Sequence, residues 1–145
     1  MPSTHNPLST LADYQHWLGT IKQRVVSARL RVALAANSEL IALYYEIGAR
    51  IVEREAHAQW GSGFIDAFSK DLRQAFPDIG GFSSKNLRYC RAFFRFYCAP
   101  AIWQQAVAKL AETPWPGVDG ALAEQLGQLP WGHNIHIFTK CGSIE

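Results

Sequence analysis

Residues 83–98 read Ser83-Ser84-Lys85-Asn86-Leu87-Arg88-Tyr89-Cys90-Arg91-Ala92-Phe93-Phe94-Arg95-Phe96-Tyr97-Cys98. The segment holds four of the chain's 14 basic residues and none of its 12 acidic residues. At about 100° per residue, one side of a helix carries a polar and cationic group: Ser84, Arg88, Arg91 and Arg95. The opposite side carries an apolar group: Leu87, Cys90, Phe93, Phe94 and Tyr97. The pattern predicts an amphipathic helix that begins at Ser83 or Ser84 and ends near Tyr97.

A second helix is predicted immediately before this segment. Apolar residues recur at helical spacing from Phe64 to Phe76, and Ser62 is a suitable N-cap. Pro77 ends the pattern, because proline lacks the backbone donor and disfavours the α conformation in the residue before it. Two helices joined by a turn over residues 77–82 indicate a helix-turn-helix-like core, with a winged form left open. The turn is longer than the three or four residues usual in that motif.

The residues further upstream predict more helix. One apolar stripe has steps of 4, 3, 4, 3 and 4: Tyr14, Leu18, Ile21, Val25, Ala28 and Val32. A second stripe follows at Leu40, Tyr44, Ile47 and Ile51. Asn37 and Ser38 fit either a cap between two consecutive helices or the interior of one long helix. The fold class is therefore mainly α, with one long or two consecutive amphipathic helices before the core.

The downstream segment gives weaker signals. Residues 103–112 are expected to form a short helix, and residues 113–117 a loop because they contain two prolines and a glycine. Residues 122–145 end in the alternating stretch Ile135-His136-Ile137-Phe138, whose periodicity assigns no single element.

Composition limits the functional classes. The chain has 145 residues, 48% hydrophobic and 18% charged, which indicates one globular domain. It has no apolar run long enough for a membrane span and no export signal, so we expect a cytoplasmic protein with reduced cysteines. His133, His136 and Cys141 are too few for a zinc site. The chain has no Gly-x-Ser-x-Gly elbow and no phosphate-binding loop. We therefore expect no catalytic residues and no cofactor.

The cationic side of residues 83–98 supports two functional hypotheses. The first is DNA binding, through the following residues: Ser84, Lys85, Asn86, Arg88, Arg91 and Arg95. Lys85 and Arg88 lie nearer the start of the helix and would read bases, whereas Arg91 and Arg95 would hold phosphates. The second is a helical protein-interaction or dimerisation module that uses the stripe from Tyr14 to Val32, with the arginines as an ordinary solvated surface.

Three blocks of sequence resemble a known family. The first comprises Asn37-Ser38-Glu39-Leu40, Tyr44-Tyr45-Glu46-Ile47-Gly48 and Arg50-Ile51-Val52, with Gly61, Leu72 and Phe76 in the next helix. The second is Gly81-Phe82-Ser83-Ser84-Lys85-Asn86-Leu87-Arg88-Tyr89, continued by Phe93-Phe94. The third is Leu129-Pro130-Trp131-Gly132-His133-Asn134. In this order they resemble the N-terminal domain of YhcG-type PD-(D/E)XK nucleases, over about residues 14–134.

The resemblance implies a bacterial, helical, DNA-binding domain at residues 9–134, between a flexible leader (1–8) and a divergent or truncated tail (135–145). In the family a nuclease domain follows, in which acidic residues and a lysine organise a divalent metal such as Mg. This chain has no Asp/Glu-x-Lys triplet. The resemblance therefore implies that this chain is not an enzyme and that its partner is duplex or branched DNA. A homodimer is left open, and no membrane partner is expected.

Overall fold

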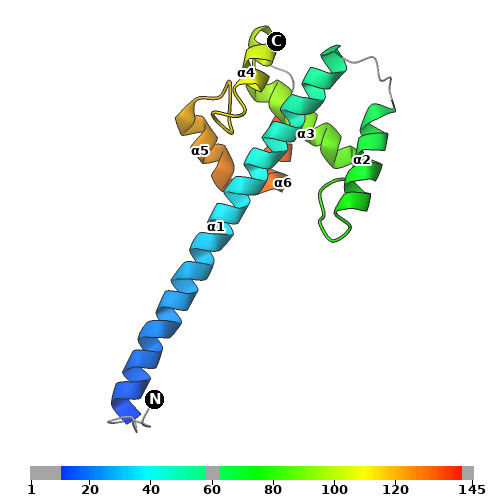
Figure 1. The fold of residues 1–145 in the computed structure, drawn as a ribbon. Helices are drawn as coiled ribbons and strands as arrows, with labels where there is room; N and C mark the ends of the chain where they lie inside the picture. The colour runs from blue at the N-terminus through cyan, green and yellow to red at the C-terminus, as the bar shows by residue number, and fades with distance from the viewer. Residues whose placement is uncertain (1–10, 58–62, 142–145) are drawn as a thin grey trace. The chain divides into compact units, whose positions relative to one another are not determined.

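The computed structural model describes residues 11–57 and 63–141. Its helices are α1 (Leu11–His57), α2 (Phe64–Ala75), α3 (Ser84–Tyr97), the 3-10 helix η1 (Pro100–Ile102), α4 (Trp103–Ala108), α5 (Gly120–Gln128) and α6 (Trp131–Lys140) (Figure 1). These described ranges contain no strand, which confirms the mainly α class and gives no support to a winged form. The chain divides into a first unit, Met1–Ala36, and a second unit, Asn37–Glu145, and α1 contributes to both.

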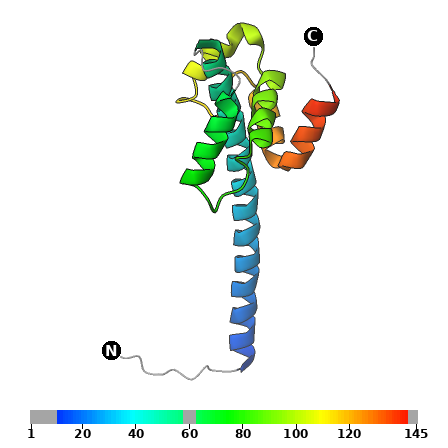
Figure 2. The same ribbon diagram turned by 90° about the vertical axis from the view of Figure 1, so that its right-hand side faces the viewer.

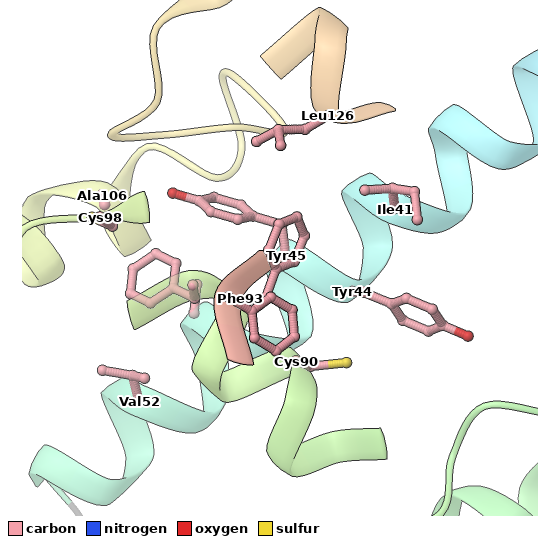
Figure 3. Close-up of a cluster of buried hydrophobic side chains, with 12 residues drawn as sticks. Ile41, Tyr44, Tyr45, Val52, Cys90, Phe93, Cys98, Ala106 and Leu126 are labelled. Carbon is pink, nitrogen blue, oxygen red and sulfur yellow. The ribbon is translucent and has the colours of Figure 1, made fainter. Parts of the chain in front are cut away.

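The second unit is built around the apolar side of α3. Leu87, Cys90, Phe93 and Phe94 are completely buried, as the periodicity predicts. The Phe93 ring lies 5.7 Å from the ring centre of Tyr45 and 5.2 Å from that of Trp131. Figure 3 shows Tyr45 of α1 and Phe93 of α3 side by side in this core. Three segments that are distant in sequence are therefore held together by edge-to-face aromatic packing.

Local signals determine where α2 and α3 begin and end. Ser83 is the N-cap of α3, and its hydroxyl accepts a hydrogen bond of 3.1 Å from the backbone N–H of Asn86. Helix α2 begins at Phe64 with Gly63 as its N-cap, and the predicted cap, Ser62, lies outside the described residues. Residues 76–83 connect the two helices. The hydroxyl of Ser69, completely buried, donates a bond of 2.6 Å to the carbonyl of Phe82 and fixes this connection on α2.

Helix α1 continues through Asn37 and Ser38, so the arrangement with one long helix is the one observed. The Asn37 amide donates hydrogen bonds to the carbonyls of Gly127 (2.9 Å) and Leu129 (3.1 Å), and the Ser38 hydroxyl donates to Gly127 (3.1 Å). Carbonyls at the end of a helix have no partner within that helix. The two polar residues are therefore not caps of α1; they supply the partners that the end of α5 needs.

The C-terminal elements differ from the prediction at one helix end. The alternating stretch Ile135–Phe138, for which the sequence predicts no element, belongs to helix α6, which runs from Trp131 to Lys140. Helix α4 ends at Ala108 and is followed by turns, so the expectation of a helix to residue 112 was too long. The expected loop at residues 113–117 is confirmed. The leader at residues 1–8 lies outside the described residues.

The three cysteines are free thiols, as expected. Cys90 and Cys98 are buried, and burial raises the pKa of both thiols. Cys141 is exposed. Close packing at Cys90 also explains a glycine in α1, because a Cβ at Gly48 would collide with the Cys90 backbone carbonyl.

Candidate nucleic-acid interface

Five of the six predicted DNA-binding residues lie on the outer side of α3, whereas Asn86 is held by contacts with α6 and with the preceding turn. We call these five the cationic face: Ser84, Lys85, Arg88, Arg91 and Arg95. Lys85, Arg88 and Arg95 are exposed, and Ser84 and Arg91 are partly buried. Figure 2 shows α3 and the other helices of the second unit from a second direction. The predicted division of this helix into an apolar side and a cationic side is confirmed.

A carboxylate from α1 bridges the two arginines in the second half of α3. Glu55 accepts a hydrogen bond from Arg91 at 2.5 Å through one oxygen and from Arg95 at 3.3 Å through the other. Partial burial is the main cause that lowers the pKa of the Arg95 guanidinium, and neighbouring Arg91 adds to it. The Arg95 guanidinium also lies 5.9 Å from the ring centre of Trp103. These contacts hold both guanidinium groups against the protein, with their remaining donors available to another acceptor.

A second carboxylate meets the first half of α3. Asp66 of α2 accepts a hydrogen bond of 3.3 Å from Arg88. A hydrogen bond with Ser84 and the nearby charge of Arg88 lower the pKa of this carboxyl below its ordinary value. Asp66 and Arg88 are both well exposed, so the pair is screened by water and salt. The pair therefore contributes little to the stability of the fold.

Lys85 and Asn86 occupy the first turn of α3 and differ in their contacts. The ammonium of Lys85 lies 5.8 Å from the ring centre of Tyr89. The Asn86 amide nitrogen donates to the Gly81 carbonyl at 2.7 Å, and its oxygen accepts from the indole N–H of Trp131 at 2.7 Å. Asn86 therefore joins α3 to α6 and to the preceding turn. A base contact by Asn86 would require breaking one of these bonds.

The cationic face carries a surplus of positive charge. Three of its four cations (Arg88, Arg91 and Arg95) pair with two carboxylates (Glu55 and Asp66), and the fourth, Lys85, lies over the Tyr89 ring. The surplus is therefore two charges, smaller than α3 alone indicates. Sequence analysis missed both carboxylates, because Glu55 lies 36 residues before Arg91 and Asp66 lies 22 residues before Arg88. No spacing rule predicts such pairs.

The described residues contain no group of three or more His, Cys, Asp or Glu side chains positioned to hold a metal. Among the helices of residues 11–57 and 63–141, none combines the length and the hydropathy that crossing a bilayer requires.

Comparison with known proteins gives the following relations. The sequence profile of the DUF1016 N-terminal domain matches residues 20–145. The chain is 37% identical over 116 residues to the protein named "Putative nuclease YhcG" of Escherichia coli (strain K12). The matched region covers 77% of this chain and 30% of that protein, so the chain spans about a third of its relative's length. No solved structure matches.

Proposed function

The chain belongs to the DUF1016 N-terminal domain family, and from this membership we propose that it is a non-catalytic DNA-binding domain. In longer relatives such a domain would position a PD-(D/E)XK nuclease domain on its substrate. The relative from Escherichia coli is named as a putative nuclease. The sequence of this chain contains no Asp/Glu-x-Lys triplet, the part of the nuclease motif that supplies an acidic residue and a lysine. The observation that carries the proposal is the surplus of positive charge on the outer side of α3.

Each residue of the cationic face has a role in this proposal. Lys85 and Arg88, in the first half of α3, would reach base edges, since arginine and lysine bind the O6 and N7 atoms of guanine. Arg91 and Arg95 would hold phosphates in the flanking backbone. Ser84 would donate to a phosphate near the start of the helix, where backbone N–H groups also favour anions. Asn86 would contribute only if it released Gly81 or Trp131.

In the proposed binding, ion pairs between arginines and the two carboxylates would be replaced by ion pairs between the same arginines and DNA phosphates. Glu55 and Asp66 lie in pairs that water reaches, and exposed ion pairs contribute only about 0–1 kcal/mol to stability. Phosphate groups would displace these carboxylates from the guanidinium groups. Release of counterions from the DNA would then drive association and make it sensitive to salt.

The test is a fluorescence-anisotropy titration of the chain with labelled duplex, branched and single-stranded DNA at about 50 and 200 mM salt, a range in which phosphate contacts weaken strongly. The double variant Arg88→Ala/Arg91→Ala should bind at least tenfold more weakly at the lower salt. The control is Arg50→Ala/Lys109→Ala, which removes two exposed positive charges outside α3 and should bind like the parent. Circular dichroism should show an unchanged helix content in both variants.

Two results would contradict the proposal. One is a parent chain that binds none of the three DNA forms at the lower salt. The other is an equal loss of affinity in the two double variants, because net charge alone would then explain binding. The DNA form that binds most tightly would identify the substrate class.

A further inference from the structure

The part of α1 in the first unit exposes an unusual amount of apolar surface. Large side chains stand in solvent along it: Trp17, Ile21, Val25, Val26, Leu30, Val32 and Leu34. The exposed fraction is 50% for Val25 and 67% for Val32. A helix gains most of its stability from packing of an apolar side, so a surface of this kind marks an interaction site.

The spacing of the stripe is that of a coiled-coil seam. Its steps of 4 and 3 place Leu18, Val25 and Val32 at one heptad position, a, and Tyr14, Ile21 and Ala28 at the other, d. Branched Val at position a suits a two-stranded pairing. Together the two positions form a continuous apolar seam from Tyr14 to Val32.

The positions beside this seam carry only positive charge. With Leu18 at position a, Lys22 and Arg29 fall at position e, and Arg24 and Arg31 fall at position g. No Asp or Glu occurs between Asp13 and Glu39. Residues at e and g form the interhelical ion pairs that decide which partner a coiled coil accepts. The seam is therefore flanked by cations on both sides.

We propose that residues 14–32 of α1 bind an acidic amphipathic helix, one with an apolar heptad seam flanked by Glu or Asp. Each flanking cation would then pair with a carboxylate across the interface. This site is separate from the cationic face of α3 and does not depend on the proposed DNA binding.

A second copy of this chain fits the seam less well. In a parallel dimer Arg24 of one copy would face Arg29 of the other, and an antiparallel dimer would also bring like charges together because all four flanking residues are cations. An anionic membrane surface fits less well too. A helix lying on a membrane keeps its far side polar, whereas here Val26, Leu30 and Leu34 occupy that side and are exposed.

The test uses the full chain and two synthetic four-heptad peptides with Ile at a and Leu at d. One peptide carries Glu at every e and g position, and the other carries Lys. Fluorescence anisotropy should show micromolar binding of the acidic peptide and none of the basic peptide. The fourfold variant Lys22→Glu/Arg24→Glu/Arg29→Glu/Arg31→Glu should reverse this preference.

A second pair of variants tests the seam itself. Ile21→Asn places an amide in the seam and should weaken binding of the acidic peptide by about tenfold or more, because it removes a large apolar group from the interface. The matched control Val26→Asn makes a similar change on the far side and should bind like the parent. Circular dichroism of both variants checks that the helix content is retained.

Several results would overturn the inference. They are no binding of the acidic peptide, equal binding of both peptides, or an unchanged preference in the fourfold variant. Self-association of the parent in analytical ultracentrifugation would assign the seam to a second copy. Binding to phosphatidylglycerol vesicles that is tighter than binding to the acidic peptide would assign the seam to a membrane. Tighter binding to duplex DNA, with an affinity that decreases in the fourfold variant, would assign it to a nucleic acid. Arg88→Ala/Arg91→Ala should bind the acidic peptide like the parent, so failure of one proposal is distinguishable from failure of the other.

Discussion

Glu55 lowers the net positive charge of the cationic face by one, and its single carboxylate is shared by Arg91 and Arg95. The variant Glu55→Gln removes this charge and leaves a side chain of the same size. We expect it to bind DNA about three- to tenfold more tightly at 50 mM salt, with a salt dependence steeper by roughly one counterion. Its stability should change by less than about 1 kcal/mol, as for other exposed ion pairs.

The control for this prediction is Glu46→Gln, on the same helix. Glu46 pairs with Arg50 four residues later and lies outside the cationic face. Both variants change the net charge by the same amount. An equal gain of affinity in the two would show that Glu55 has no local role.

Gly48 is required by the approach of α1 to α3. The variant Gly48→Ala would place a methyl group against the carbonyl of Cys90, which is backbone and cannot rotate away. We expect a loss of about 1–3 kcal/mol in the free energy of unfolding, measured by urea denaturation. The matched control Gly132→Ala meets no atom within 4 Å and should change stability by less than about 1 kcal/mol.

The sequence predicts the residues of the site more completely than their partners. The apolar and cationic sides of α3 follow from helical periodicity, which depends only on neighbours along the chain. The bond between Asn86 and Trp131 joins residues that are 45 positions apart, and it arises only after α6 packs on α3. The sequence therefore places Asn86 among the DNA-binding residues, and only its tertiary contacts show that it joins α3 to α6 and to the preceding turn.

The contact between the Asp66 carboxylate of α2 and the residues Ser84 and Arg88 of α3 depends on pH. The hydrogen bond with Ser84 and the charge of Arg88 hold the pKa of Asp66 below 3.8, its value in an unfolded chain. A carboxyl of this kind stabilises the folded state above its unfolded pKa, and this stabilisation is lost as the pH falls through the lower, folded pKa.

We therefore expect the thermal midpoint of the parent to decrease as the pH falls below about 4, because Asp66 becomes protonated. In Asp66→Asn this decrease should be smaller, because the variant has no carboxyl group at this position to become protonated. Differential scanning calorimetry between pH 3 and pH 6 measures the difference. Parallel curves for the two proteins would contradict the assigned role of Asp66.

Elements with strong local signals were predicted, and elements defined by distant contacts were not. Pro77 and Ser83 determine the ends of α2 and α3 through the backbone itself. The unbroken course of α1 depends on Asn37 and Ser38 finding partners in α5, a contact that no local pattern reveals. The alternation at residues 135–138 assigns no element by itself, and the segment is helical because Asn134 and Phe138 lie on one side of α6 and are both buried.

The core of the second unit should make the whole chain sensitive to alkali. Burial raises the pKa of Tyr45 and Cys90 above their ordinary values of 10.0 and 9.0. Groups of this kind stabilise the fold fully below their unfolded pKa, and the stabilisation is lost as the pH rises towards the folded pKa. We expect the thermal midpoint to decrease above about pH 9. Ultraviolet absorbance of the tyrosinate ion should increase over the same pH range as the buried tyrosine ionises.

The variant Tyr45→Phe separates two contributions of this tyrosine. Its hydroxyl donates a hydrogen bond to the carbonyl of Pro116, so the variant should lose about 1–3 kcal/mol at neutral pH. Above pH 10 its stability should fall less steeply than that of the parent, because one buried group no longer ionises. An equally steep fall would contradict the role of Tyr45.

The placement of the three cysteines has a practical and chemical consequence. Alkylating reagents and peroxide attack the thiolate, and burial keeps Cys90 and Cys98 protonated and out of reach. Cys141 alone is exposed, just beyond the end of α6. A maleimide dye should therefore attach at one position in the folded chain, without any cysteine having to be replaced. Oxidative damage should likewise begin at the edge of the molecule and leave its aromatic interior unmodified.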